Sequence, residues 1–166
     1  MKTLRLALST LAATAATVIF ATLRVPVLSV VDWFLLAVAY QAAGGSFIAS
    51  TLGGAIGGLV EDLLLHPLRG ANAFAKALLG YSFTLVSVRV VFGGSLVVGG
   101  TLAIAALVND GIVGALGRLL LGTPFRIAWS DIGRALATGG TGGVLYWAWR
   151  FPWKEEWRRR QRRRLR

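Results

Sequence analysis

Long apolar stretches separated by isolated charges dominate this chain of 166 residues. Runs of 18, 28 and 20 residues without a charge lie between Arg5 and Arg24, between Asp32 and Glu61, and between Arg89 and Asp110. About 20 mostly apolar residues cross a bilayer as a helix. Because each run is about that long or longer, the pattern predicts an all-α, polytopic membrane protein.

The longest of these runs is interrupted by AAGGS at 42–46, which is a turn signal between two helices. The chain is therefore expected to form six helices, at 4–23, 27–43, 46–65, 71–91, 95–121 and 131–150. The fifth helix contains NDG at 109–111, which could break it into a span and a short re-entrant piece. We predict a six-helix transmembrane domain over 1–152 and a basic cytoplasmic tail over 153–166.

Composition supports this class, since 55% of residues are hydrophobic, 15% are charged and the mean hydropathy is +0.66. Soluble domains average about 25% charged residues. The first segment follows Lys2 and Arg5 as a signal peptide would, but it is longer than a usual signal core and five more apolar segments follow. We interpret it as a retained span. The chain has no cysteine, which excludes disulfides and thiolate sites.

The net charge of +11 is concentrated at the carboxyl end. The tail WKEEWRRRQRRRLR carries one Lys, seven Arg and two Glu, so it holds a net +6. By the positive-inside rule this end lies in the cytoplasm, and six spans place the amino terminus on the same side. The charge pattern therefore predicts a multi-pass membrane protein with both termini cytoplasmic.

Aromatic and basic residues gather where the last helix leaves the membrane. Indole rings favour the headgroup layer, and basic residues near anionic lipid each contribute about 1 kcal/mol. We interpret the group as an anchor to anionic lipid, with a docking site for a cytoplasmic protein as the alternative; no nucleic acid is expected to bind. The anchoring residues are Trp147, Trp149, Trp153, Trp157, Arg158, Arg159 and Arg160.

No arrangement of residues indicates catalysis, a metal or a cofactor. His66 is the only histidine, and no second metal ligand lies at a suitable spacing. Glu61 and Asp62 are consecutive, so on a helix they point about 100° apart and cannot flank one substrate as a paired acid and base. The sequence therefore favours a protein without enzymatic activity.

Small residues form rows at helical spacing. Ala49, Gly53 and Gly57 lie on one face of the third helix, and Glu61 continues the same row. Such rows let helices approach closely in lipid. This row either packs against the chain's own helices or seats a partner helix. A second row, Gly111, Gly114 and Gly117, is the next candidate for a seat.

The charged residues between the third and fourth helices predict a polar hairpin. Pro67 and Gly70 indicate a tight turn, and Asn72 is a plausible helix cap. Across this turn, Asp62 is expected to meet Lys76 or Asn72, while Glu61 points toward Arg69 or water. The charges are expected within about two turns of the outer membrane face, where long side chains reach the interface.

The stretch GGLVEDLLLHPLRGANAFAKALLGY resembles the signature of the rod-shape-determining protein MreD family. A glycine-containing helix with an acidic residue near its end is followed by a short turn and a helix that closes in Gly-Tyr. VPVLSVVDWFLLAVAY is similar to that family's entry into its second helix. Arg69 and the long arginine tail depart from the family pattern. The residues that carry the likeness are Gly58, Asp62, Pro67, Leu68, Gly70, Asn72 and Gly80.

The resemblance implies a non-enzymatic inner-membrane scaffold of the bacterial cell-elongation complex. Proteins of this family associate with MreC, a single-span protein, and through it with RodA, a class B penicillin-binding protein and MreB. The resemblance also implies a six-helix arrangement similar to the substrate-binding subunits of energy-coupling-factor transporters, so the alternative is a small-ligand binding subunit of a transporter. A channel-like or holin-like protein is a more distant possibility. For MreC, the expected seat is the row Ala49, Gly53, Gly57 and Glu61.

Overall fold

The computed structural model describes residues 2–22, 30–43, 45–65, 70–89, 94–122 and 128–150. Within these ranges the protein is entirely helical, with six helices and no strand, which confirms the predicted all-α class there. The observed ranges match the expected ones closely, except at the start of the second helix. The helices are α1 (Lys2–Thr22), α3 (Trp33–Ala42), α4 (Phe47–Leu65), α5 (Ala71–Arg89), α6 (Ser95–Leu121) and α7 (Trp129–Arg150).

Helix α3 is shorter than expected because an aspartate caps it. Asp32 Oδ1 accepts a hydrogen bond from the Leu35 N–H at 2.8 Å, which fixes Asp32 as the residue before the first helical turn. The chain bends at 30–31 immediately before it. Ten residues of helix extend only about 15 Å. The predicted start at 27 lies outside the described residues.

Helix α6 continues without a break through Asn109, Asp110 and Gly111, so the possible re-entrant piece is not present. Asn109 and Asp110, which suggest a turn in the sequence, instead contact side chains of α5 and α7. The helix ends at Gly122, whose φ of 66° closes the last turn through its N–H and the Arg118 carbonyl. The 27 residues of α6 make it the longest described helix.

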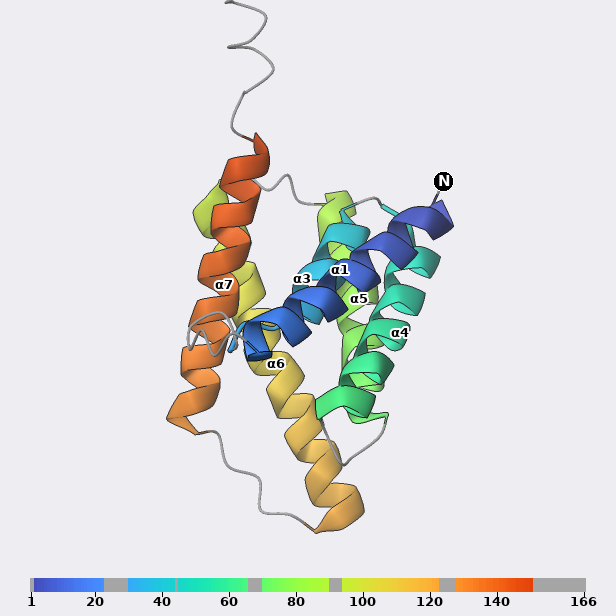
Figure 1. Ribbon diagram of the computed structural model, residues 1–166, viewed down its shortest axis with the longest axis vertical. Helices are drawn as coiled ribbons and strands as arrows, with labels where there is room; N and C mark the ends of the chain where they lie inside the picture. Colours follow the sequence, from blue (N-terminus) through green and yellow to red (C-terminus); the bar gives the residue numbers. More distant parts are fainter. Residues whose placement is uncertain are drawn as a thin grey trace, which may run out of the picture.

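Two antiparallel helix pairs, α4–α5 and α6–α7, lie on either side of α3, and α1 crosses the outside of α3 and α4 (Figure 1). Helix α3 contacts all five other helices. Its buried residues form the centre of the apolar core. This core consists of Leu35, Val38, Ala42, Leu79, Phe83, Leu102, Ala105, Ala106 and Ala135.

The outer surface of the bundle is rich in large apolar side chains, whereas several charged side chains are buried. On α4, for example, Ile48, Leu52 and Leu63 face outward, while Glu61 and Asp62 are buried. This distribution is the reverse of the usual one in water. Two helices, α4 and α6, are long and apolar enough to cross a membrane.

Candidate functional site

The ammonium group of Lys76 lies at the centre of a buried polar network. Its Nζ is 2.8 Å from Asp32 Oδ2 and 2.6 Å from Glu61 Oε2. The three side chains, from α5, the start of α3 and α4, are 0%, 2% and 5% exposed. A charge is costly to bury unless oppositely charged groups accompany it. Lys76 therefore depends on both carboxylates, and each carboxylate depends on Lys76.

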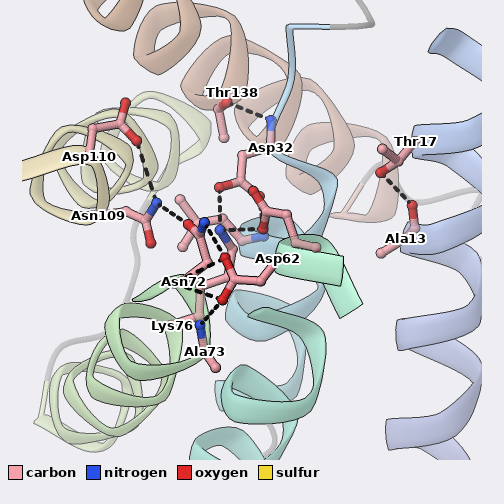
Figure 2. Close-up of polar contacts among 12 residues, drawn as sticks. Ala13, Thr17, Asp32, Asp62, Asn72, Ala73, Lys76, Asn109, Asp110 and Thr138 are labelled. Carbon is pink, nitrogen blue, oxygen red and sulfur yellow. Dashed lines mark hydrogen bonds and ion pairs between the residues drawn. The ribbon is translucent and has the colours of Figure 1, made fainter. Parts of the chain in front are cut away.

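Asp32 connects three helices through different atoms. Its Oδ1 caps α3 and its Oδ2 contacts Lys76 of α5. Its backbone N–H donates to Thr138 Oγ1 of α7 at 3.0 Å, and Thr138 is fully buried. Figure 2 shows these contacts converging on Asp32. The start of α3 is thus held to both helix pairs.

Asp62 closes the end of the α4–α5 hairpin. Its carboxylate accepts hydrogen bonds from the backbone N–H groups of Gly70, Asn72 and Ala73, at 2.9, 3.1 and 3.3 Å. The Asn72 side chain adds a fourth bond, from Nδ2 at 2.8 Å (Figure 2). Free N–H groups at a helix amino terminus favour a negative charge. Asp62 is therefore stabilised by α5 itself.

The network continues from Asn72 to α6 and α7. Asn109 Nδ2 donates to Asn72 Oδ1 at 3.2 Å and, more weakly, to Asp110 Oδ1 at 3.4 Å. Asp110 forms an ion pair with Arg134 of α7. This last pair is partly exposed, with side-chain values of 13% for Asp110 and 30% for Arg134. The polar network therefore runs from α4 to the surface of α6–α7.

Glycines allow α4 and α5 to pack with their backbones in contact. A Cβ at Gly54 would overlap the Lys76 carbonyl oxygen, and one at Gly58 would overlap the Asn72 carbonyl oxygen. A Cβ at Gly80 would overlap the Ser50 carbonyl in the same way. This close approach sets the distance between the helices from which Glu61, Asp62 and Lys76 project.

The predicted polar hairpin has a different pairing from the one expected. Asp62 meets Asn72, as one of the two expected alternatives has it, but Lys76 pairs with Glu61 and Asp32 rather than Asp62. Gly70, at φ 95°, turns the first N–H groups of α5 onto Asp62. Lys76 lies one helical turn beyond Asn72 and reaches Glu61 instead. The expectation that Glu61 points toward Arg69 or water is therefore corrected, since Glu61 is buried beside Lys76.

The row predicted to seat MreC faces α3 of the same chain. The Gln41 side chain lies over Gly53, and Phe34 packs over Gly57. Glu61, at the end of the row, is buried against Lys76, and Ala49 at its start is partly buried. The self-packing alternative therefore describes this row. In the second row, Gly111 faces open space and Gly117 is buried.

The predicted lipid anchor is described only at its start. Trp147 is exposed on the surface of α7. The Trp149 side chain, Trp153, Trp157 and residues 158–160 lie outside the described residues, as do His66, Pro67, Leu68 and Arg69. The lipid-anchoring role of the tail remains a prediction.

Sequence reasoning does not assign five members of the network, which are Asp32, Asn109, Asp110, Arg134 and Thr138. A signal existed for Asp32, because an aspartate immediately before the apolar run WFLLAVA is a typical helix cap. Asn109 was noticed only as a possible helix break, although a polar residue inside an apolar helix also suggests a buried partner. Nothing local in the sequence distinguishes Thr138.

The described residues contain no group of three or more His, Cys, Asp or Glu side chains that could hold a metal ion. Asp32, Glu61 and Lys76 are buried, which leaves a substrate no direct approach to them. The geometry is that of a network that joins helices. No protein-family model, curated protein or solved structure matches the chain.

Proposed function

We propose that this protein is a non-enzymatic inner-membrane scaffold of the MreD type. In this role it binds MreC and helps couple peptidoglycan synthesis to cell shape, and MreC connects it to RodA, a class B penicillin-binding protein and MreB. Its basic tail contacts anionic lipid at the cytoplasmic face. The protein acts by holding partners in place rather than by chemistry.

The observation that carries the proposal is that the described residues of the MreD-like stretch form one closed unit. Gly58 and Gly80 bring α4 and α5 into backbone contact. Asp62, Gly70 and Asn72 close the end of this hairpin through hydrogen bonds. The residues that resemble the MreD family thus act together to join α4 to α5. This supports a fold shared with that family rather than a chance similarity of sequence.

The six-span arrangement is supported by the apolar outer surface and by the spacing of two exposed tryptophans on α7. Trp129 and Trp147 are both exposed and lie 18 residues apart, a distance of about 27 Å on a helix. The hydrocarbon core of a bilayer is about 30 Å thick, and tryptophans favour its two boundaries. The length of α7 between these two tryptophans therefore matches the thickness of a bilayer, although α7 is less apolar than α4 and α6.

Thr138 relates this spacing to the polar network. Thr138 lies nine residues from both Trp129 and Trp147. Because Thr138 accepts the Asp32 N–H, Asp32 lies level with the middle of α7, whereas Glu61, the other partner of Lys76, lies about one turn from the end of α4. Buried charges inside a membrane protein are expensive and usually functional.

A partner helix must bind an outward face, because α3 covers the small-residue row of α4. Purification of a tagged copy from membranes, with mass spectrometry of its companions, tests the proposal. Recovery of MreC and RodA is expected. An ATPase module and a coupling subunit would instead identify the alternative, a small-ligand binding subunit of a transporter. An untagged copy expressed at the same level gives the background.

The proposed orientation has its own test, which uses the absence of cysteine from the chain. Ser130→Cys, at the exposed start of α7, should react with a membrane-impermeant thiol reagent added to intact cells. Gln161→Cys, in the basic tail, should react only after the membrane is opened. The reverse pattern would place both termini outside and contradict the scaffold model.

A further inference from the structure

The two helix pairs are each held together by backbone contact. In α4–α5 these contacts are at Gly54, Gly58 and Gly80, as described above. In α6–α7, a Cβ at Gly139 would overlap the Gly99 carbonyl oxygen, and one at Gly99 would crowd the Gly139 carbonyl. Separating the helices of a pair would break these backbone contacts along its length. Each pair therefore moves as one body.

The surface between the two pairs, which we call the seam, has two different halves. Leu79 and Phe83 of α5 pack with Leu102 of α6 and with Ala42 of α3, so one half is apolar. The other half is held by two hydrogen bonds, from Asn109 Nδ2 to Asn72 Oδ1 and from the Asp32 N–H to Thr138 Oγ1. The polar half lies toward the end of the bundle at which α4 ends and α5 begins.

Within the polar half, one buried acceptor has no donor. The carbonyl Oδ1 of Asn109 makes no hydrogen bond, although Asn109 is fully buried. An unpaired buried acceptor costs free energy that water would recover. The closed seam therefore has an unsatisfied buried acceptor in the half that hydrogen bonds cross.

We propose that the seam opens at its polar half while the apolar half stays closed, so that α6–α7 tilts away from α4–α5 and water reaches Asn109. The apolar half acts as the hinge, because its interlocked side chains have no polar partner to gain from separation. The Asp32–Thr138 hydrogen bond acts as the latch. This motion belongs to the chain itself and does not depend on the identity of the partner.

Thiol reactivity in proteoliposomes tests the opening directly. Ala75 is fully buried and lies on the same face of α5 as Asn72 and Leu79, which places it in the seam beside the polar half. Ala42 is equally buried in the apolar half. We expect a small water-soluble methanethiosulfonate to modify Ala75→Cys about tenfold or more faster than Ala42→Cys, because local opening exposes only the first. Equal rates, or a faster Ala42→Cys, would overturn the proposal.

The latch is tested by a matched pair of threonines, both fully buried. Thr138→Val removes the acceptor of the Asp32 N–H and should speed modification of Ala75→Cys roughly fivefold to tenfold, the effect of one lost hydrogen bond. Thr138→Ser keeps the hydroxyl and should restore the rate. Thr84→Val removes a bond to Ser50 inside the α4–α5 pair and should leave the rate unchanged.

If Thr138→Val and Thr84→Val raise the rate equally, the variants loosen the whole bundle and no latch exists. Size-exclusion chromatography shows whether each variant is folded and monodisperse. Should Thr138→Val fail to fold, the comparison of Ala75→Cys with Ala42→Cys in the otherwise unchanged chain still decides whether the polar half opens.

Discussion

The helix pairs α4–α5 and α6–α7 both pack closely at glycines, but they differ in how deeply their charged side chains are buried. Both use glycine to bring backbones together. In α4–α5 the ion pair of Glu61 and Lys76 is buried, whereas in α6–α7 the Asp110–Arg134 pair is partly exposed. Each pair thus combines glycine contact with an ion pair, and burial of the α4–α5 pair allows its Lys76 to hold Asp32 at the start of α3 as well.

The largest expected difference between the pairs lies in their cations. Lys76→Met leaves Asp32 and Glu61 buried beside each other without an ammonium group and should destabilise the protein by about 3–5 kcal/mol. Arg134→Met removes a partly exposed partner and should cost about 1 kcal/mol or less. Thermal unfolding in detergent, followed by circular dichroism, measures both. Similar losses would mean that burial does not distinguish the two ion pairs.

The same comparison predicts which partner is coupled to Lys76. In a double-mutant cycle, Lys76→Met and Glu61→Gln should be strongly non-additive, by about 1 kcal/mol or more, because their charged groups are in contact. Lys76→Met and Asp62→Asn should be closer to additive, since Asp62 is held by the start of α5. A larger coupling for Asp62 than for Glu61 would restore the pairing expected from sequence.

Glycine substitutions should affect the two pairs alike. Gly54→Ala and Gly139→Ala each place a methyl group against a backbone carbonyl and should destabilise by about 1–3 kcal/mol. Gly100→Ala is the matched control, since it meets open space on α6 and should stabilise slightly, by up to about 1 kcal/mol, through helix propensity. A neutral Gly139→Ala would show that α6–α7 is packed more loosely than its backbone contacts indicate.

The smallest difference in stability is expected between two aspartates whose carboxylates accept hydrogen bonds from backbone N–H groups. Asp62→Asn loses charge within a buried set of donors and should cost about 1–2 kcal/mol. Asp131 accepts the Ala128 N–H at an exposed position, so Asp131→Asn should cost about 0.5 kcal/mol or less. Denaturant or thermal unfolding under identical detergent conditions separates the two values. A reversed order would contradict the assignment of Asp62 as the closure of the hairpin.

The helices could be predicted because charge spacing and hydropathy act locally. The boundaries of α4, α5 and α6 follow from uncharged runs and from turn residues such as Gly70. The start of α3 was missed because the apolar residues before Asp32 extend the hydrophobic pattern past the helix cap. The local sequence pattern therefore predicts which segments are helical, but it predicts the capped ends of the helices less accurately.

The candidate site was harder to predict because its partners are distant in the chain. Asp32 and Lys76 are 44 residues apart, and Asp32 and Thr138 are 106 residues apart. No spacing rule connects such residues, so the sequence could supply only partners that are near in the chain. Of the two partners expected for Asp62, Asn72 is observed, whereas Lys76 pairs with Glu61 and Asp32. Which helix covers the row at Gly53 and Gly57 likewise depends on the three-dimensional arrangement.

The buried carboxylates of α4 also depend on a helix that is made after them. Glu61 and Asp62 leave the ribosome before Lys76 and before the N–H groups of α5 that hold Asp62. Until α5 has been made, these two carboxylates of α4 have neither the ammonium group nor the N–H groups that hold them in the finished bundle.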